Sequence, residues 1–193
     1  MKCTKVDHCR EPDWYPVDWD SHLSLHNWVE TLDLTCKNPY HVALMGSMYF
    51  AGAIASGFFV TRLGDIYGRK WPTIFSAVIS IPIHLSLILS RDLNFSIVMF
   101  FLYGLTRPGK MQVSFVYVSE LVPSRYRKWI GSFILLFHGS SMILAALYFL
   151  LISKSWVSFQ VFALTLTVLS TATLFFVPES PKFLLEKGRL REA

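Results

Sequence analysis

Charged side chains are scarce in this chain of 193 residues. Only 16% of its residues are Asp, Glu, Lys or Arg, whereas 53% are hydrophobic. An ordinary soluble domain carries about 25% charged residues, spread along its sequence. Because so few charges leave long stretches without any, the composition argues against a single water-soluble domain and favours a chain embedded in a membrane.

Patterns typical of several other functional classes are also missing. The net charge is +5, but the sequence contains no basic patch with interleaved aromatic residues. It therefore does not predict a nucleic-acid partner. The His residues do not stand at zinc-ligand spacing from the three Cys, so we expect no metal site and no cofactor. His138 and Ser141 lie three residues apart on one predicted helix, where their side chains diverge. Since no Gly-x-Ser-x-Gly motif is present either, we do not expect an enzyme.

Long apolar runs are the main feature that the sequence does have. Five of them cover residues 42–61, 71–90, 93–119, 129–153 and 155–178, and the third is interrupted by Arg107 and Lys110. About 20 residues of helix cross the hydrocarbon core of a bilayer, and backbone groups in lipid must pair within their own segment. We therefore predict an all-α membrane protein with a helical bundle of five transmembrane helices. The bundle covers 42–178, follows a polar segment at 1–41 and precedes the start of a loop at 179–193.

The orientation follows from the basic residues of the connections. Ten lie on one side of the predicted bundle: Arg62, Arg69, Lys70, Arg125, Arg127, Lys128, Lys182, Lys187, Arg189 and Arg191. The connections on the other side hold only Arg91 and Lys154. Because Lys and Arg are enriched in cytoplasmic loops, we expect the first side to be cytoplasmic and residues 1–41 to be exterior.

The exterior segment contains Cys3, Cys9 and Cys36. Disulfides persist outside the cytoplasm, and the sequence leaves open which two Cys pair or whether all three are free thiols. Residues 1–41 show no secretory signal peptide. The segment is therefore either translocated by the first predicted helix or, as we favour, preceded by a further helix upstream of Met1.

Short motifs stand in the predicted cytoplasmic connections. They read TRLGDIYGRK at 61–70, ELVPSRYRK at 120–128 and PESPKFL at 178–184, and Gly104 precedes Pro108-Gly109 in the third run. In this order and topology they resemble the major facilitator superfamily, in particular its organic cation and anion transporters. The resemblance covers nearly the whole chain. It implies that the five runs correspond to helices 2–6 of the N-terminal half, with helix one and the second half absent.

The resemblance implies a transporter that moves small organic ions or solutes by alternating access. It also implies an ion-pair network that closes the cytoplasmic side, made of Asp65, Gly68, Arg69, Glu120, Arg125, Arg127 and Glu179. Exposed ion pairs are worth about 0–1 kcal/mol each, so such a network can open and close. As an alternative, the basic residues of this set serve only to fix the topology.

The third run carries the residues most informative about a substrate. Tyr103, Arg107, Lys110, Ser114 and Tyr117 recur at helical spacing, which predicts that they share one face. A charge at the bilayer centre costs about 2.5–3.5 kcal/mol, so Arg107 and Lys110 need a wet cavity or a partner. We predict a substrate site of Arg107, Lys110, Tyr117 and His138 that favours an anionic solute. Alternatively, the two cations pair with an acid elsewhere or reach an interface, and His138, like His84, makes an interhelical hydrogen bond.

The expected partners are the lipid bilayer, a small organic solute and a missing half-bundle from the same gene or another chain. We expect a multi-pass membrane protein, and the plasma membrane is compatible with this reading. Alternating access needs two half-bundles. The chain is therefore part of an intact transporter, a half that assembles with another, or a transport-inactive membrane interaction or regulatory subunit.

Overall fold

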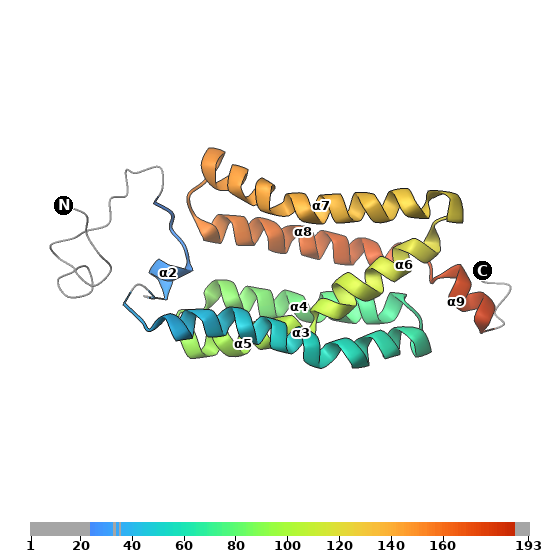
Figure 1. Cartoon of the computed structure of the whole chain (residues 1–193), viewed down its shortest axis with the longest axis horizontal. Coiled ribbons are helices and arrows are strands. Elements are labelled where there is room, and N and C mark those ends of the chain that lie inside the picture. The colour runs from blue at the N-terminus through green and yellow to red at the C-terminus, as the bar shows by residue number, and fades with distance from the viewer. Residues whose placement is uncertain (1–23, 33, 35, 188–193) are drawn as a thin grey trace.

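The computed structural model describes residues 24–32, 34 and 36–187. Its elements are α2 (Trp28–Thr31), α3 (Pro39–Tyr67), α4 (Lys70–Leu89), α5 (Leu93–Leu105), the π-helix η2 (Gly109–Val113), α6 (Ser114–Leu121), α7 (Ser124–Leu151), α8 (Trp156–Phe176) and α9 (Pro181–Glu186). The long helices run side by side along the molecule (Figure 1). The described part is thus helical, as predicted. Cys36 is disulfide-bonded, whereas Cys3 and Cys9 lie outside the described residues.

Four helices, α3, α4, α7 and α8, are long and apolar enough to cross a membrane. The third predicted span, 93–119, instead forms α5, η2 and α6, which contain 13, 5 and 8 residues. The break coincides with Pro108, which has no backbone N–H and disturbs a helix at an interior position. A wider π turn follows it directly. Four of the five predicted spans are therefore found as single helices. That residues 93–119 also cross the membrane stays a prediction.

Local capping explains where several helices begin. The side chain of Asn38 accepts a hydrogen bond from the Tyr40 backbone N–H at 3.0 Å, and Pro39 follows as the first residue of α3. Asp92 accepts in the same way from the Asn94 N–H at 3.2 Å at the start of α5. Asn and Asp are favoured at this position because their oxygens satisfy N–H groups that the helix leaves unpaired.

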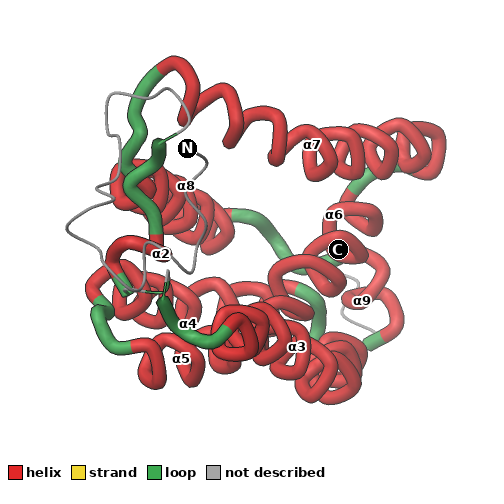
Figure 2. The backbone as a smooth tube through the Cα atoms, turned by 60° about the vertical axis from the view of Figure 1, so that its left-hand side comes forward, coloured by secondary structure: helices red, strands yellow, loops and turns green. Residues whose placement is uncertain are grey.

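Close backbone contact holds α3 against α5. A Cβ atom placed on Gly52 would overlap Phe101 O, and one placed on Gly104 would overlap Tyr49 O. Small residues of this kind let membrane helices approach closely. By contrast, α7 has no buried residue, and both ribbon views place it away from α3, α4 and α5 (Figures 1 and 2). The ring of Phe149 reaches α8 at Phe159, with 5.3 Å between the ring centroids.

The segment around α2 covers one end of the bundle, and we call residues 26–32 and 34 the tryptophan clasp. The Trp28 ring contacts Phe100 of α5 and Trp156 of α8, at centroid distances of 4.9 and 5.2 Å. Leu32 and Leu34 are buried in one cluster with residues of α3 and α5. The Trp156 backbone N–H also donates to His26 O at 2.9 Å. The clasp therefore ties α3, α5 and α8 together at this end.

We predict that Gly52→Ala destabilises the chain, whereas Gly46→Ala on the same helix does not. The new methyl group at position 52 meets the backbone of Phe101, while nothing lies within 4 Å of a Cβ at position 46. Overpacking of this kind costs about 1–3 kcal/mol. Thermal unfolding in detergent measures the difference, and equal melting temperatures for the two variants would contradict the packing described above.

Candidate functional site

The carboxylate of Glu179 closes the predicted cytoplasmic end of the bundle. Its Oε1 accepts hydrogen bonds from the backbone N–H groups of Arg69, Lys70 and Ser180 at 3.0, 3.1 and 3.0 Å. Lys70 is the first residue of α4, and no side chain of Arg69 caps that helix. Since a helix N-terminus leaves N–H groups unpaired and attracts negative charge, Glu179 supplies the cap that α4 lacks.

Gly68 makes this contact sterically possible. Its φ of +100° lies where side chains are rarely tolerated, and a Cβ there would approach Glu179 Oε2 to 2.7 Å. A glycine adopts this conformation without strain. The turn between α3 and α4 and the seat of the Glu179 carboxylate therefore depend on the same residue.

Glu120, at the end of α6, is the second acid at this place. It accepts a hydrogen bond from the Ser180 hydroxyl at 2.7 Å and lies 3.5 Å from Arg69 Nε and 3.9 Å from Lys182 Nζ. Arg69 also pairs with Asp65. We call Asp65, Arg69, Glu120, Glu179 and Ser180 the carboxylate cluster. The Glu120 side chain is only 11% exposed, whereas that of Asp65 is 63% exposed, so the inner pair is less screened by water than the outer one.

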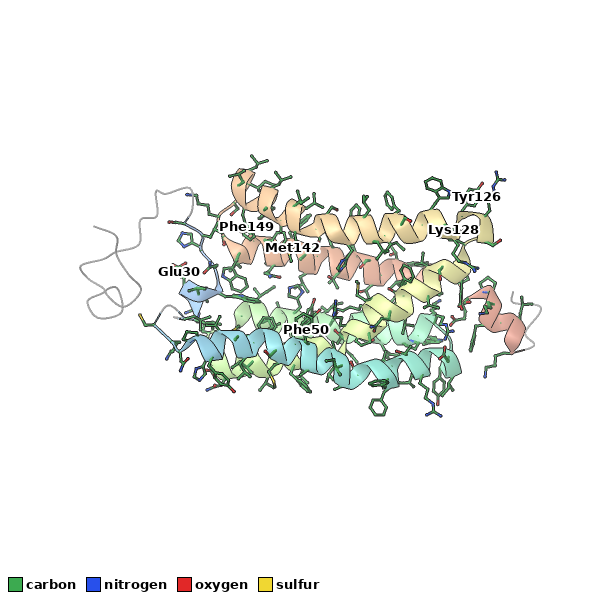
Figure 3. The ribbon with its side chains drawn as sticks, viewed as in Figure 1. Glu30, Phe50, Tyr126, Lys128, Met142 and Phe149 are labelled. Carbon is green, nitrogen blue, oxygen red and sulfur yellow. The ribbon has the colours of Figure 1, made fainter. Side chains whose placement is uncertain are left out.

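The structure brings five of the seven predicted network residues together and leaves two apart. Arg127 Nε donates to Ser119 O at 2.9 Å, and the Arg125 guanidinium lies 5.8 Å from the Tyr126 ring centroid. Both lie at the start of α7. Their neighbours Tyr126 and Lys128 are labelled there in Figure 3. The sequence interpretation missed Ser180, although a Ser directly before Pro181 is a typical helix-capping pattern.

The predicted substrate residues occupy different surroundings. The Arg107 guanidinium lies 5.8 Å from the ring centroids of Tyr49 and Phe50 on α3, and Figure 3 labels Phe50 midway along the bundle. Lys110 Nζ lies 4.2 Å from the centre of the Tyr103 ring. Rings stabilise cations at such distances by about 0.5–2 kcal/mol. No Asp or Glu occurs in the five apolar runs, so no acid of these runs pairs with either cation.

Arg107 lines a groove of about 630 Å³ that follows one face of α3. The groove is apolar along most of its length, with Phe50, Ile54 and Phe58 among its lining residues. Polar groups gather toward one end, where Thr61, Arg62, Asp65 and Gln112 line it. Its combination of aromatic walls and a few polar groups is typical of a site for a small organic molecule.

Tyr117 and His138 do not join Arg107. The Tyr117 side chain is buried, and its hydroxyl donates to the carbonyl of Pro178, beside the carboxylate cluster. His138 lies on α7 with an exposed side chain. The expected interhelical hydrogen bond is found instead at His84, whose Nε2 lies 2.8 Å from Gln160 Oε1 of α8. The π-helix η2 changes the number of residues per turn within the predicted face, and Tyr103 and Lys110 of that face still lie together.

Comparison with known proteins places the chain among transporters. Residues 23–193 match the model of the family described as "Sugar (and other) transporter". The chain is 27% identical to the organic cation/carnitine transporter 2 of Mus musculus, covering 91% of this chain and 32% of that protein. It is 26% identical to solute carrier family 22 member 2 of Mus musculus, covering 93% of this chain and 38% of that protein.

A relative from another organism carries a different description. The vacuolar protein sorting-associated protein 73 of Saccharomyces cerevisiae is 26% identical, covering 100% of this chain and 39% of that protein. The chain thus spans 32–39% of the length of these relatives. The family match covers most of the chain and agrees with the apolar helices. This multi-pass membrane protein therefore belongs to the sugar (and other) transporter family of the major facilitator superfamily and is similar to its organic cation transporters.

Proposed function

We propose that the chain forms part of a transporter that moves a small organic ion or solute by alternating access. The observation that carries this proposal is the carboxylate cluster, which joins the turn between α3 and α4 to the end of α6 and to the segment after α8. Such a fold needs a second half-bundle to rock against. We propose that another part of the same protein or a partner chain supplies it.

The cluster is suited to act as a reversible latch on the cytoplasmic side. Asp65 is largely exposed while bound to Arg69, so its carboxylate is open to a second partner across the cytoplasmic mouth. Hydrogen bonds to charged groups contribute about 1.5–3 kcal/mol each, and exposed ion pairs about 0–1 kcal/mol. Several such contacts hold one conformation, yet a rocking motion can break them together.

We predict that Glu179→Ala opens the latch in the transporter that contains this half. A Cys at Thr61, which lines the groove, should react about tenfold faster with a membrane-impermeant thiol reagent added to inside-out vesicles. A tenfold change corresponds to about 1.4 kcal/mol of lost stabilisation. Lys187→Ala is the matched control, since Lys187 lies beyond the cluster on an exposed turn. Equal labelling rates in both variants would exclude the latch.

The groove beside Arg107 is the proposed substrate path, and Arg107 its contact for an anionic group. Its guanidinium is always protonated and offers planar, bidentate donors to a carboxylate. We keep Lys110 as a second cation near this contact, while the Tyr117 hydroxyl is already engaged with Pro178. A role of His138, which lies on α7, in substrate binding stays a prediction.

Uptake of a labelled organic anion tests the substrate role. We expect Arg107→Ala to lower uptake about 10- to 100-fold, the range that losing one charge-assisted hydrogen bond of about 1.5–3 kcal/mol predicts. Arg107→Lys should retain part of the activity, because it keeps the charge but not the fork of donors. Arg91→Ala removes an exposed cation from a turn and should leave uptake unchanged. Undiminished uptake by Arg107→Ala would remove Arg107 from the site.

A second function is favoured by the unburied surface of α7, which has no buried residue along 28 positions. In this alternative the chain is a transport-inactive half that binds a partner in the membrane as an interaction or regulatory subunit. Reconstitution of the complete transporter or complex that contains this chain separates the two, because uptake of an organic solute excludes the inactive form and a lack of uptake excludes the transport function. Surface biotinylation of the same chain in cells tests the proposed location in the plasma membrane.

A further inference from the structure

A large apolar pocket lies between α3 and α4, beyond the end of α5. Helix α5 ends at Leu105, and the chain continues through η2 into α6, which runs obliquely toward the start of α7 (Figure 1). The pocket has a volume of about 690 Å³ and is lined by α3, by α4 and by the end of α5 at Leu102, Leu105 and Thr106. We call it the α3–α4 pocket. It is separate from the groove beside Arg107.

The walls of this pocket are large apolar side chains. Trp71, Phe75 and Ile79 recur at every fourth residue of α4 and therefore share one face of that helix. The rings of Trp71 and Phe75 lie 6.2 Å apart, and Leu63 and Tyr67 line the pocket from α3. These five side chains are between 43% and 64% exposed. A concave site of this kind suits a ligand that is mostly hydrophobic and carries few polar groups.

The α3–α4 pocket reaches from the predicted cytoplasmic interface toward the centre of the bilayer. Tyr67 is the last residue of α3 and Trp71 the second of α4, and rings of these two types favour the interface. From Trp71 to Ile83, α4 advances about 18 Å at about 1.5 Å per residue. One leaflet contributes about 15 Å of the hydrocarbon core. The pocket therefore has about the length of the hydrophobic part of one lipid of the cytoplasmic leaflet.

The pocket and the groove beside Arg107 lie on different faces of α3. Val60, Leu63 and Tyr67 line the pocket at helical spacing, whereas Phe58 lines the groove. Phe58 and Val60 are separated by two residues, which is about 200° around a helix. This step rests on the proposed function: because the second half-bundle meets the groove beside Arg107, the α3–α4 pocket opens toward lipid.

The mouth of the pocket offers neutral polar groups. The two basic residues of the turn are engaged, because Arg69 is held in the carboxylate cluster and the Lys70 ammonium donates to Phe175 O. The Tyr67 hydroxyl and the Trp71 indole N–H, by contrast, form no hydrogen bond within the part of the chain that the structure describes. A lipid phosphate would have to compete for cations that already have partners. A single hydroxyl group can pair with Tyr67 directly, since a phenol both donates and accepts.

We propose that the α3–α4 pocket binds a sterol of the cytoplasmic leaflet, with its hydroxyl group at Tyr67 and its fused rings against Trp71 and Phe75. A rigid ring system loses less conformational freedom on binding than a flexible acyl chain does. The order Leu63, Tyr67, Arg69 also fits the short sequence pattern suggested for sterol contact, and here Leu63 and Tyr67 both line the pocket. The site goes beyond the proposed transport function, because it binds a membrane lipid and not the transported solute.

Photolabelling of the complete protein or complex that contains this chain tests the site. In nanodiscs of phosphatidylcholine with a photoreactive cholesterol analogue, we expect label on residues that line the pocket. Excess unlabelled cholesterol should remove this label, whereas added phosphatidylserine should not. Tyr67→Phe keeps the ring but loses the hydroxyl group, and should lower the labelling about two- to tenfold, as expected for the loss of one hydrogen bond. Tyr126→Phe, at an exposed position near the start of α7, is the matched control and should leave it unchanged.

A blocking variant separates a binding site from ordinary contact with lipid. Ile79→Trp fills the pocket and should abolish the label that cholesterol removes. Val78→Trp changes the neighbouring exposed position of α4, which does not line the pocket, and should retain that label.

Four results would overturn the sterol site. They are label spread evenly over the apolar helices, equal displacement by phosphatidylserine, equal labelling of Tyr67→Phe and the parent protein, and a pocket without label, as when another polypeptide covers it. Since no transport is measured, each of these results stands apart from any failure of the proposed function.

Discussion

The structure depends on two antiparallel helices that cap one another, α4 and α8. At its start, α4 has no cap of its own, and the Glu179 carboxylate that follows α8 binds the backbone N–H groups there. In return, the Lys70 ammonium donates to Phe175 O in the last turn of α8 at 3.1 Å. Each charge lies at the helix end whose dipole it complements. The start of α4 is thus capped only when the segment after α8, more than a hundred residues later in the chain, returns to it.

The same helix pair is also fixed along its length and at its opposite end. His84 near the end of α4 and Gln160 near the start of α8 join the two helices close to the tryptophan clasp. The clasp itself binds the start of α8 through Trp156. With α3 held to α5 at Gly52 and Gly104, these helices form one connected body. Helix α7, which has no buried residue, stands outside it. Any rocking motion is therefore expected to move α3, α4, α5 and α8 as a unit, with the carboxylate cluster at its edge.

Hydropathy and charge predicted the helical class and four of the spans because crossing a bilayer requires apolar length, which a sequence displays directly. Motif resemblance placed Gly68, Arg69 and Glu179 in one network, and they do meet. The π-helix after Pro108 was not predicted, because the spacing argument for Tyr103 to Tyr117 assumed 3.6 residues per turn throughout. Arg125 and Arg127 could not be separated from the network by sequence, because neighbouring positions in a basic loop look alike. The clasp was missed because the partners of Trp28 lie far away in the chain.

The two intramembrane cations have different chemical capacities, and their surroundings match that difference. Arg107 has a planar guanidinium with several donors, and it lies beside the Tyr49 and Phe50 rings where it lines the groove. Lys110 is a compact point charge, and its Nζ lies 4.2 Å from the centre of the Tyr103 ring. With no acid in the apolar runs, aromatic rings lie beside both charges, and the proposed substrate contact rests on Arg107 because its guanidinium also lines the groove.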